Sequence, residues 1–329
     1  MFNFIFIQTI LNFLLTFFLL QYYLKNIKYK ILYDNNPLGL GSNKKTKTGS
    51  GIIFSIILIS NLLYYFLNQS FLEIQPNRFY IFIFSILLLS VISFVDDLKP
   101  LDPRLRLIFQ AVIIYFSLSL IDLYYFKLPL KLMILIYLCF WIYIINITNF
   151  IDGADGYLCI NAMSFFFGLI ILNHFIPNGF FSFYISLILI PILVSFIYFN
   201  KPKAKLYMGD TGSILLGYVI GFCFLELISS EYWYIAIGLY FYPILDCTLT
   251  ILKKIFSGVS VFDRNFSYFF QLPIKKIQKN NFNVLSISII YNLLNLAIIT
   301  FVLYFENPYL VIFSIILSFI KIRIFEILN

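Results

Sequence analysis

The sequence predicts an all-α, polytopic membrane protein of about eleven transmembrane helices, folded as a single domain over residues 1–329. Composition is the first observation behind this fold class. Of the 329 residues, 61% are hydrophobic and only 12% are charged, whereas soluble domains carry roughly 25% charged residues. The second observation is a series of apolar runs about 20 residues long, the length at which a helix crosses the hydrocarbon core with its backbone groups satisfied. The third is the uneven distribution of Lys and Arg between the polar breaks, which sets the orientation.

The apolar runs follow one another with short polar breaks, and one longer break lies at about 251–283. The expected helices cover 3–24, 50–67, 79–95, 107–125, 128–146, 158–175, 179–199, 213–230, 232–250, 284–305 and 308–326. The first run has no basic segment before it and no small-residue cleavage site after it, so we expect a retained helix rather than a signal peptide. The second begins at a Gly-rich turn. The remaining runs are separated by breaks that carry most of the Asp, Asn and Lys residues.

The orientation follows from the basic residues, which collect on the cytoplasmic side of membrane proteins. With the N-terminus outside, 20 of the 23 Lys and Arg lie inside, and only Arg78, Lys127 and Lys131 lie outside. Eleven helices then place the C-terminus inside. The same topology puts nine of the ten Asp inside and four of the five Glu outside, which charge balance alone would not produce. We therefore expect any chemical function at a cytoplasmic cleft.

Charge and cysteine content exclude two other classes. The net charge of +8 is explained by topology and by attraction to anionic lipid headgroups, so no nucleic-acid partner is expected. The four cysteines are scattered through apolar stretches and show neither a metal-ligand spacing nor a disulfide framework. The single histidine, His174, is expected at a surface near an outer loop.

The first polar motif on the cytoplasmic side is Asp96-Asp97, at the start of a break that ends with Arg106. Adjacent carboxylates raise each other's proton affinity, which suits one of them to accept a proton or to share a divalent cation. Carboxylate and amide oxygens are the ligands that Mg²⁺ prefers, completed by substrate phosphates. A solvated turn that caps helices is the alternative interpretation of this pair.

The second motif is the string from Asn146 to Gly156, which contains Asn146, Asn149, Asp152 and Asp155. The first three are spaced at i, i+3 and i+6, so on a helix they share one face. Polar groups at the end of a spanning helix are costly unless they bind something or one another. Gly153 lets the backbone approach a ligand. The alternative is a helix C-terminus with Gly caps and structural hydrogen bonds.

The third motif runs from Asn200 to Ser213 and contains Lys205, Tyr207 and Asp210. Asp210 precedes a helix expected to start near Ser213, whose free N–H groups and dipole favour a phosphate. The neighbouring lysines would neutralise that phosphate, and Tyr207 could stack on a base. The alternative is an ordinary loop with a positive-inside signal. Two weaker candidates are Lys47, in a basic Gly-rich turn, and Arg264, whose guanidinium suits a diphosphate.

Together these motifs resemble the polyprenyl-phosphate N-acetylhexosamine-1-phosphate transferase superfamily, glycosyltransferase family 4. This superfamily includes enzymes that start O-antigen, teichoic acid and peptidoglycan lipid intermediates, and is related to phospho-MurNAc-pentapeptide translocase. The resemblance rests on the Asp96-Asp97 pair with Arg106 and Gln110, on the Asn-x-x-Asn-x-x-Asp-Gly-x-Asp-Gly string, and on Met-Gly-Asp-x-Gly-Ser at 208–213. It spans most of the chain, in the family's order.

The resemblance implies ten or eleven helices around a cytoplasmic cleft, in an enzyme that uses Mg²⁺, with Mn²⁺ as an alternative. Asp210 and Asn149 would bind the metal, and Asp96 or Asp97 would deprotonate or orient the lipid phosphate, which makes Asp96, Asp97 and Asp210 the catalytic set. The remaining implied contacts, to the nucleotide and its phosphates, are Asn146, Asp152, Gly153, Asp155, Asn200, Lys205, Tyr207, Lys47 and Arg264.

One departure from the family pattern lies in the long break. The family's Asp-Arg-x-His-x-His-His reads Asp-Arg-Asn-Phe-Ser-Tyr-Phe at 263–269, so all three histidines are absent. In the family those histidines lie near the diphosphate or the sugar. The departure therefore concerns either recognition of the usual N-acetylhexosamine or activity itself.

The resulting hypothesis is an enzyme of the inner (cytoplasmic) membrane that moves a sugar-1-phosphate from a UDP-sugar to polyprenyl (undecaprenyl) phosphate, releases UMP and initiates a cell-envelope glycan. A homodimer is compatible with the sequence. The first alternative is a catalytically degenerate homologue that binds a UDP-sugar or scaffolds glycan assembly. The second is a transporter, which would require ionisable residues near the bilayer midplane, whereas here the charges lie at helix ends.

Overall fold

A computed structural model of the chain describes residues 2–27, 32–34, 46–67, 75–122, 128–177, 180–260, 267–276 and 281–328. The described part is helical apart from a two-residue antiparallel ribbon. Its elements are α1 (Phe2–Asn26), β1 (Tyr33–Asp34), β2 (Thr46–Lys47), α2 (Gly51–Leu67), α3 (Pro76–Leu98), α4 (Pro103–Ser117), η1 (Leu118–Leu120), α5 (Leu130–Phe150), α6 (Tyr157–Phe175), α7 (Phe181–Asn200), α8 (Gly209–Ser229), α9 (Trp233–Phe256), η2 (Phe269–Gln271), α10 (Leu272–Lys276), α11 (Asn281–Tyr304), η4 (Pro308–Val311) and α12 (Ile312–Ile327).

The prediction of a polytopic all-α membrane protein is confirmed. Each of the eleven predicted apolar runs contains a helix, and within the described residues nine helices are long and apolar enough to cross a membrane. Helix α4 reaches this length only together with η1, over Pro103–Leu120, and α2, with 17 residues, and α12, with 16, fall short of it. The long break at 251–283 also contains a short helix, α10, that the apolar pattern did not indicate. Which membrane side each end faces stays a prediction.

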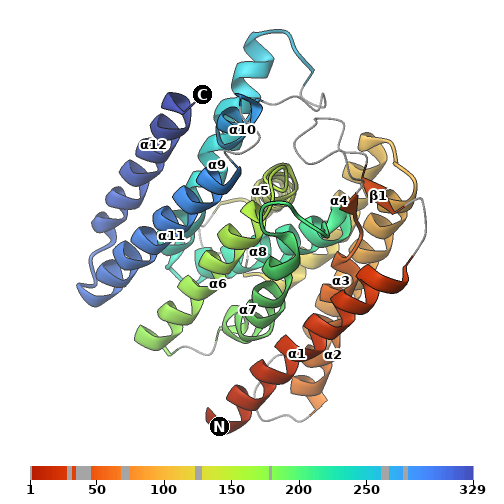
Figure 1. Cartoon of the computed structure of the whole chain (residues 1–329). Helices are drawn as coiled ribbons and strands as arrows, with labels where there is room; N and C mark the ends of the chain where they lie inside the picture. The colour runs from red at the N-terminus through yellow and green to blue at the C-terminus, as the bar shows by residue number, and fades with distance from the viewer. Residues whose placement is uncertain are drawn as a thin grey trace.

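Helix α8 lies at the centre of the bundle and is almost entirely buried, with its closest packing against α5 and α3 (Figure 1). Two glycines make this packing possible. A Cβ at Gly217 would stand 2.7 Å from the Ile145 Cα, and one at Gly221 would collide with the Trp141 ring. The Trp141 indole N–H donates to the Tyr218 carbonyl at 2.9 Å. The helix that carries Asp210 is therefore held rigidly by its neighbours.

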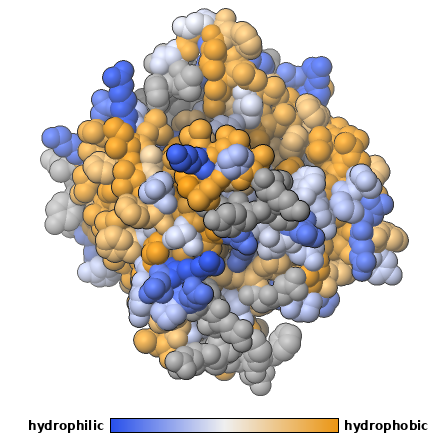
Figure 2. All heavy atoms as spheres, turned by 180° about the vertical axis from the view of Figure 1, so that it is seen from behind, coloured by the Kyte–Doolittle hydropathy of each residue, from blue (hydrophilic) through white to orange (hydrophobic). Residues whose placement is uncertain are grey.

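The outer helices present apolar side chains to the surroundings. Figure 2 shows much of one face covered by hydrophobic residues, with hydrophilic residues gathered in separate patches. Exposed residues of this kind include Phe18 on α1, Leu293 on α11 and Phe313 on α12. Such extensive exposed apolar surface is what a lipid environment requires.

Several helix boundaries differ from the sequence expectation, and three of these differences change where predicted site residues lie. Helix α3 continues through Asp96 and Asp97 to Leu98, instead of ending at 95. Helix α8 begins at Gly209 rather than near Ser213, so Asp210 lies in its first turn. Helix α5 extends to Phe150, so Asp152 lies beyond its end and does not share a helical face with the two asparagines. Hydropathy did not show these extensions because polar residues end an apolar run without ending the helix.

Candidate active site

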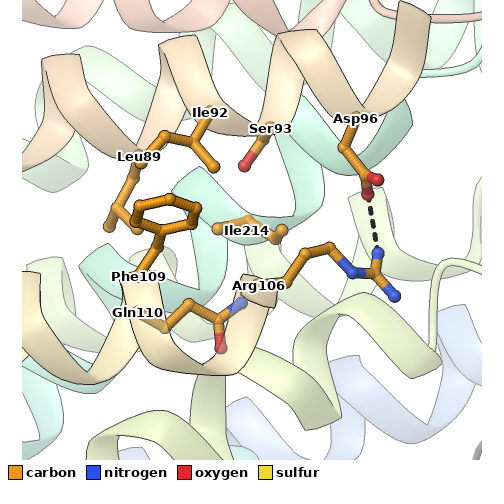
Figure 3. Close-up of a pocket in the computed structure, with 8 residues that line it drawn as sticks. All are labelled: Leu89, Ile92, Ser93, Asp96, Arg106, Phe109, Gln110 and Ile214. Carbon is orange, nitrogen blue, oxygen red and sulfur yellow. Dashed lines mark hydrogen bonds and ion pairs between the residues drawn. The ribbon is translucent and has the colours of Figure 1, made fainter. Parts of the chain in front are cut away.

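The turn between α3 and α4 brings Asp96 and Arg106 together. Pro103 opens α4, and the Asp102 carboxylate caps the helix by accepting from the Arg104 N–H at 2.7 Å. Arg106 then lies in the first turns of α4, and its Nη1 donates to Asp96 Oδ2 at 2.7 Å, as Figure 3 shows. The other Asp96 oxygen accepts from the Leu101 N–H at 2.6 Å. Asp96 is thus oriented by both the turn and the facing helix.

Arg106 also reaches Asp210, which lies 104 residues further along the chain. The same Nη1 atom donates to Asp210 Oδ2 at 2.6 Å. The side chains of Arg106 and Asp210 are 22% and 21% exposed, against 5% for Asp96. A ligand from solution could therefore reach the Arg106–Asp210 side of this arrangement.

Asp97 points to the first turn of α8. Its two oxygens accept from the Asp210 N–H at 2.8 Å, the Thr211 N–H at 3.1 Å and the Thr211 hydroxyl at 2.5 Å. A carboxylate at a helix N-terminus satisfies N–H groups that have no partner within the helix and interacts favourably with the dipole. Gly209 makes the approach possible, since its φ is +74° and a Cβ there would stand 2.5 Å from Asp97 Oδ2. Two of the N–H groups expected to be free for a phosphate are therefore occupied.

We call Asp96, Asp97, Arg106 and Asp210 the carboxylate cluster. Asn149 lies next to it, because its Oδ1 accepts from the Ser213 hydroxyl at 3.0 Å, and the same hydroxyl lies 3.5 Å from the Asp210 carbonyl. Asn146, one turn earlier on α5, donates to Gln110 Oε1 of α4 at 3.0 Å. The first and third motifs and the asparagines of the second therefore converge on the start of α8.

Asp155, Asn200 and Tyr207 form a second group, which we call the loop junction. Asp155 accepts from the N–H groups of Lys203 and Ala204 at 3.0 and 3.2 Å and from the Tyr207 hydroxyl at 3.3 Å. Asn200 accepts from the Gly156 N–H at 3.0 Å and donates to the Leu206 carbonyl at 2.9 Å. These contacts join the turn before α6 to the loop before α8. Burial raises the pKa of the Asp155 carboxyl, and its three donors offset part of that effect.

Lys47 lies beside the loop junction, and Lys205 points away from it. Lys47 is in β2, its carbonyl accepts from the Tyr207 N–H at 2.8 Å, and its ammonium donates to the Leu24 carbonyl at 2.5 Å. Lys205 is exposed, with its Nζ 6.0 Å from the centre of the Tyr198 ring. Arg264 lies outside the described residues.

The segment 267–276 packs against Gly153 and the start of α6. At two of the positions where the family pattern has histidine, Tyr268 and Phe269 are buried, at 8% and 3% exposure. The N–H groups of Phe269 and Phe270 donate to the buried Asp246 carboxylate, at 2.9 and 3.2 Å, and Phe270 stacks on Tyr157 with ring centres 4.3 Å apart. These aromatic residues therefore anchor the segment in the core.

The side chain of Gln271 lies against the backbone of Gly153. A Cβ at Gly153 would collide with the Gln271 amide nitrogen, so any larger residue there would displace the end of that side chain. Asp152, which follows the end of α5, is partly exposed beside it. The predicted residues of this turn therefore lie against the segment that departs from the family pattern.

Sequence reasoning did not include Arg106, Thr211 or Gln271 among the site residues. The signal for Arg106 was available, because a Pro-containing turn between two apolar helices folds Asp96 and Arg106 onto facing helix ends. Thr211 follows Asp210 directly, but its role depends on the helix beginning at Gly209, which hydropathy does not show. Gln271 carries no motif.

Comparison with known proteins finds a family that resembles part of the chain. Residues 79–228, which run from α3 to the end of α8, match the sequence model of glycosyl transferase family 4. Over these residues the chain is similar to glycosyl transferase family 4. The matched region contains the carboxylate cluster, Asn149 and the loop junction, so the family resemblance predicted from the motifs is confirmed.

The similar proteins of this family include three phospho-N-acetylmuramoyl-pentapeptide-transferases. The protein from Aliarcobacter butzleri is 26% identical over 277 residues, covering 71% of this chain and 76% of its own length. The protein from Thermotoga neapolitana is 27% identical over 264 residues, covering 75% and 81%. The protein from Leuconostoc citreum is 33% identical over 143 residues, covering 39% and 43%. The chain is thus a distant relative of these enzymes and an integral membrane protein with many candidate spans.

Proposed function

We propose that this chain transfers a sugar-1-phosphate from a UDP-sugar to polyprenyl phosphate at the cytoplasmic face of the membrane, releasing UMP. An oxygen of the lipid phosphate attacks the β-phosphorus of the UDP-sugar. The bond from that phosphorus to the bridging oxygen breaks, and UMP leaves. The observation that carries this proposal is the contact of one guanidinium with both Asp96 and Asp210, which joins two family motifs at a partly exposed position.

Arg106 is suited to bind the acceptor phosphate. A guanidinium has five donors in a rigid fork and forms bidentate pairs with phosphate. Its Nη1 holds Asp96 and Asp210 together, so other N–H groups of the same guanidinium are available to an incoming anion. Asp96, fixed by the Leu101 N–H and by Arg106, is placed to orient that phosphate or to take its proton. Asp97 fixes the first turn of α8 and therefore the position of Asp210.

The donor set beside Arg106 fits Mg²⁺. Within the described ranges no three His, Cys, Asp or Glu side chains are grouped to hold a metal by themselves. Mg²⁺ commonly takes one or two carboxylates and completes its coordination with waters and substrate phosphates. Asp210 provides a carboxylate of this kind, and Asn149, whose Oδ1 accepts from Ser213 in the same first turns of α8, provides an amide oxygen. When bound there, the ion would neutralise charge that develops on the diphosphate.

The donor sugar is expected to be an N-acetylhexosamine or a derivative whose recognition does not depend on the family's histidines. At two of those positions Tyr268 and Phe269 are buried, with Tyr268 against the Phe150 ring and the Lys253 ammonium 4.0 Å from the centre of the Phe269 ring, and neither supplies an imidazole. The buried Gln271, at 3% exposure, lies against Gly153 in the same segment. This substitution supports a change in sugar recognition while the carboxylate cluster is retained.

The test is UMP release by the purified full-length chain with undecaprenyl phosphate, Mg²⁺ and a panel of UDP-sugars. We expect release that depends on lipid and metal, is abolished by EDTA and is lost in Asp210→Asn. Asp102→Asn is the matched control, because it makes the same change on an exposed capping carboxylate outside the cluster. Absence of UMP for every sugar, in protein that still binds a UDP-sugar, would contradict the proposal and favour the catalytically degenerate homologue.

A further inference from the structure

Lys321 is a buried cation that the site described above does not use. It lies in α12, which packs against α9 and α11 on one side of the bundle (Figure 1). The residue is 2% exposed, and within the described part of the chain its ammonium nitrogen has no hydrogen-bond partner. Burying a charge without such partners is costly, so packing alone does not account for a lysine at this position.

Aromatic rings surround the Lys321 ammonium. Its nitrogen lies 3.8 Å from the centre of the Tyr242 ring, 4.3 Å from that of Tyr291 and 5.2 Å from that of Tyr157. The face of an aromatic ring attracts a cation within about 6 Å of its centre, and more strongly where water is excluded. The three rings belong to α9, α11 and α6. The ammonium therefore joins the C-terminal helix to three other helices.

Two routes connect this ammonium to the segment that departs from the family pattern. In the first, the Tyr242 hydroxyl donates to Asp246 Oδ2 at 2.8 Å, and the same carboxylate accepts from two backbone N–H groups of the segment. Lys321 lies close enough to Asp246 for the two charges to attract each other. In the second, Tyr157 stacks on Phe270. Groups in contact with Lys321 therefore hold both the backbone and a ring of the segment.

The segment in turn lies against the turn that follows α5. The Gln271 side chain contacts Gly153, and the Tyr268 ring lies 6.0 Å from the Phe150 ring at the end of α5. Asn149 precedes Phe150 directly. A shift of the segment would therefore move groups that pack beside the predicted contacts of the donor substrate.

We propose that Lys321 is a positioning residue for the donor sugar. Through Asp246 and Tyr157 it fixes residues 268–271 in one place beside Gly153, and this placement determines which sugar the site accepts. The inference rests on the proposed function. Stability alone does not explain the buried charges, because replacing a buried pair by apolar groups is often neutral or stabilising. What the pair provides is a single arrangement of the segment.

Hydrogen exchange tests the positioning without requiring turnover. Amide exchange of the full-length protein in phospholipid nanodiscs would be followed by mass spectrometry for the wild type, Lys321→Met and Arg323→Met. Arg323 is the matched control, because its side chain is 79% exposed on the same helix. We expect exchange at 268–271 to be on the order of tenfold faster in Lys321→Met, since removal of one partner leaves the other charge uncompensated. Unchanged exchange there would overturn the proposal.

A second comparison tests whether Lys321 acts through Asp246. In the Asp246→Asn background, Lys321→Met leaves no uncompensated charge, so it should accelerate exchange at 268–271 much less than it does in the wild-type background. Equal effects in the two backgrounds would contradict the proposed route. If the single variant Lys321→Met unfolds, a folded double variant shows the same coupling, and a double variant that unfolds as well would contradict it.

Sugar selectivity separates positioning from stability. We expect Lys321→Met to reduce the ratio of kcat/KM between the best and the second-best UDP-sugar by about tenfold, the effect of one altered pocket contact. The KM for undecaprenyl phosphate should not change, and Arg323→Met should leave the ratio as in the wild type. A loss of folded protein lowers all rates by one factor and leaves the ratio unchanged. An unchanged ratio would therefore reject the role in sugar recognition.

The two kinds of measurement separate failure of this inference from failure of the proposed function. Absence of UMP release from the wild type, together with faster exchange at 268–271 in Lys321→Met, would reject the transferase and retain Lys321 as the residue that fixes the segment. UMP release together with unchanged exchange and selectivity in Lys321→Met would retain the transferase and reject the positioning role.

Discussion

The carboxylate cluster and the loop junction are both built from predicted site residues, but they use their polar groups differently. In the cluster, Asp96 and Asp210 contact a charged side chain from another helix, and that guanidinium is 22% exposed. In the loop junction, Asp155 and Asn200 contact backbone N–H and C=O groups and are buried. The cluster therefore holds charge that a substrate can reach, whereas the junction uses its hydrogen bonds to fix two loops to each other.

This difference explains why aspartates from different motifs of one chain can have separate roles. A buried backbone group that loses its partner carries the full desolvation cost, so the junction residues are required for the fold whether or not they touch a nucleotide. A cluster of charges at a partly exposed position is stabilised incompletely by its own members and gains from a ligand. We expect cluster variants to lose activity with little loss of stability, and junction variants to do the reverse.

The largest expected effect is that of Arg106→Met. This change removes the only described side-chain cation in contact with Asp96 and Asp210, and loss of one electrostatic contact to a developing charge costs on the order of 10²–10³ in kcat. Arg106→Lys keeps the charge but not the fork, so an intermediate rate is expected. UMP release measures all three proteins. Arg104→Met, on an exposed arginine two residues earlier, is the control. Equal rates for the Arg104 and Arg106 variants would show that the contact of Arg106 with Asp96 and Asp210 does not contribute to the reaction.

The next effect is that of Asp155→Ala on stability. The change leaves the part-buried N–H groups of Lys203 and Ala204 without their acceptor, so the free energy of unfolding should fall by about 2 kcal/mol. Thermal unfolding in detergent measures the loss, and Asp102→Ala, at an exposed helix cap, should cost about 1 kcal/mol. A raised KM for the UDP-sugar at unchanged stability would instead give Asp155 the nucleotide-contact role that the sequence predicted.

A smaller effect is expected for Gly153→Ala, which tests the boundary between the two regions. The added methyl group would displace the Gln271 amide, and because a flexible side-chain end can move, the cost should be about 1 kcal/mol, the low end of overpacking effects. Gln271→Ala in the same chain should remove that cost. A double-mutant cycle on unfolding free energies measures the coupling, and zero coupling would show that the two residues do not touch.

The sequence could predict the helices, because an apolar run is a local property of the chain. It could also predict that the motifs converge, because the summed Lys and Arg counts place all the polar breaks concerned on one side of the membrane. All eleven predicted runs contain helices, and Asp96, Asp97, Asp210 and Asn149, expected in one site, do lie around the first turn of α8. Their catalytic and metal-binding roles stay predictions. Asp155, Asn200 and Tyr207 were also expected together, and they contact one another's loops.

The sequence could not predict which partner each polar group takes. Asp97 and Asp96 are adjacent, but successive helical residues point about 100° apart, so one faces α8 and the other faces Arg106. Nor could it show that Tyr268 and Phe269 would be buried, since that depends on Asp246 accepting from the segment's backbone. Partner choice is set by the packing of α3, α4 and α8, and hydropathy and spacing contain little information on it.

The smallest expected effect is that of Thr211→Val, which separates the two contributions of Asp97. The change removes the hydroxyl donor to Asp97 but keeps both backbone donors and the side-chain shape. The unfolding free energy should fall by about 1 kcal/mol, the net value of one hydrogen bond, with UMP release nearly unchanged. Thr300→Val, which loses only a bond to the Leu296 carbonyl within α11, is the control and should cost less. A large loss of activity in Thr211→Val at unchanged stability would mean that the Asp97 orientation, and not only the start of α8, limits the transfer step, and the cluster would then include Thr211.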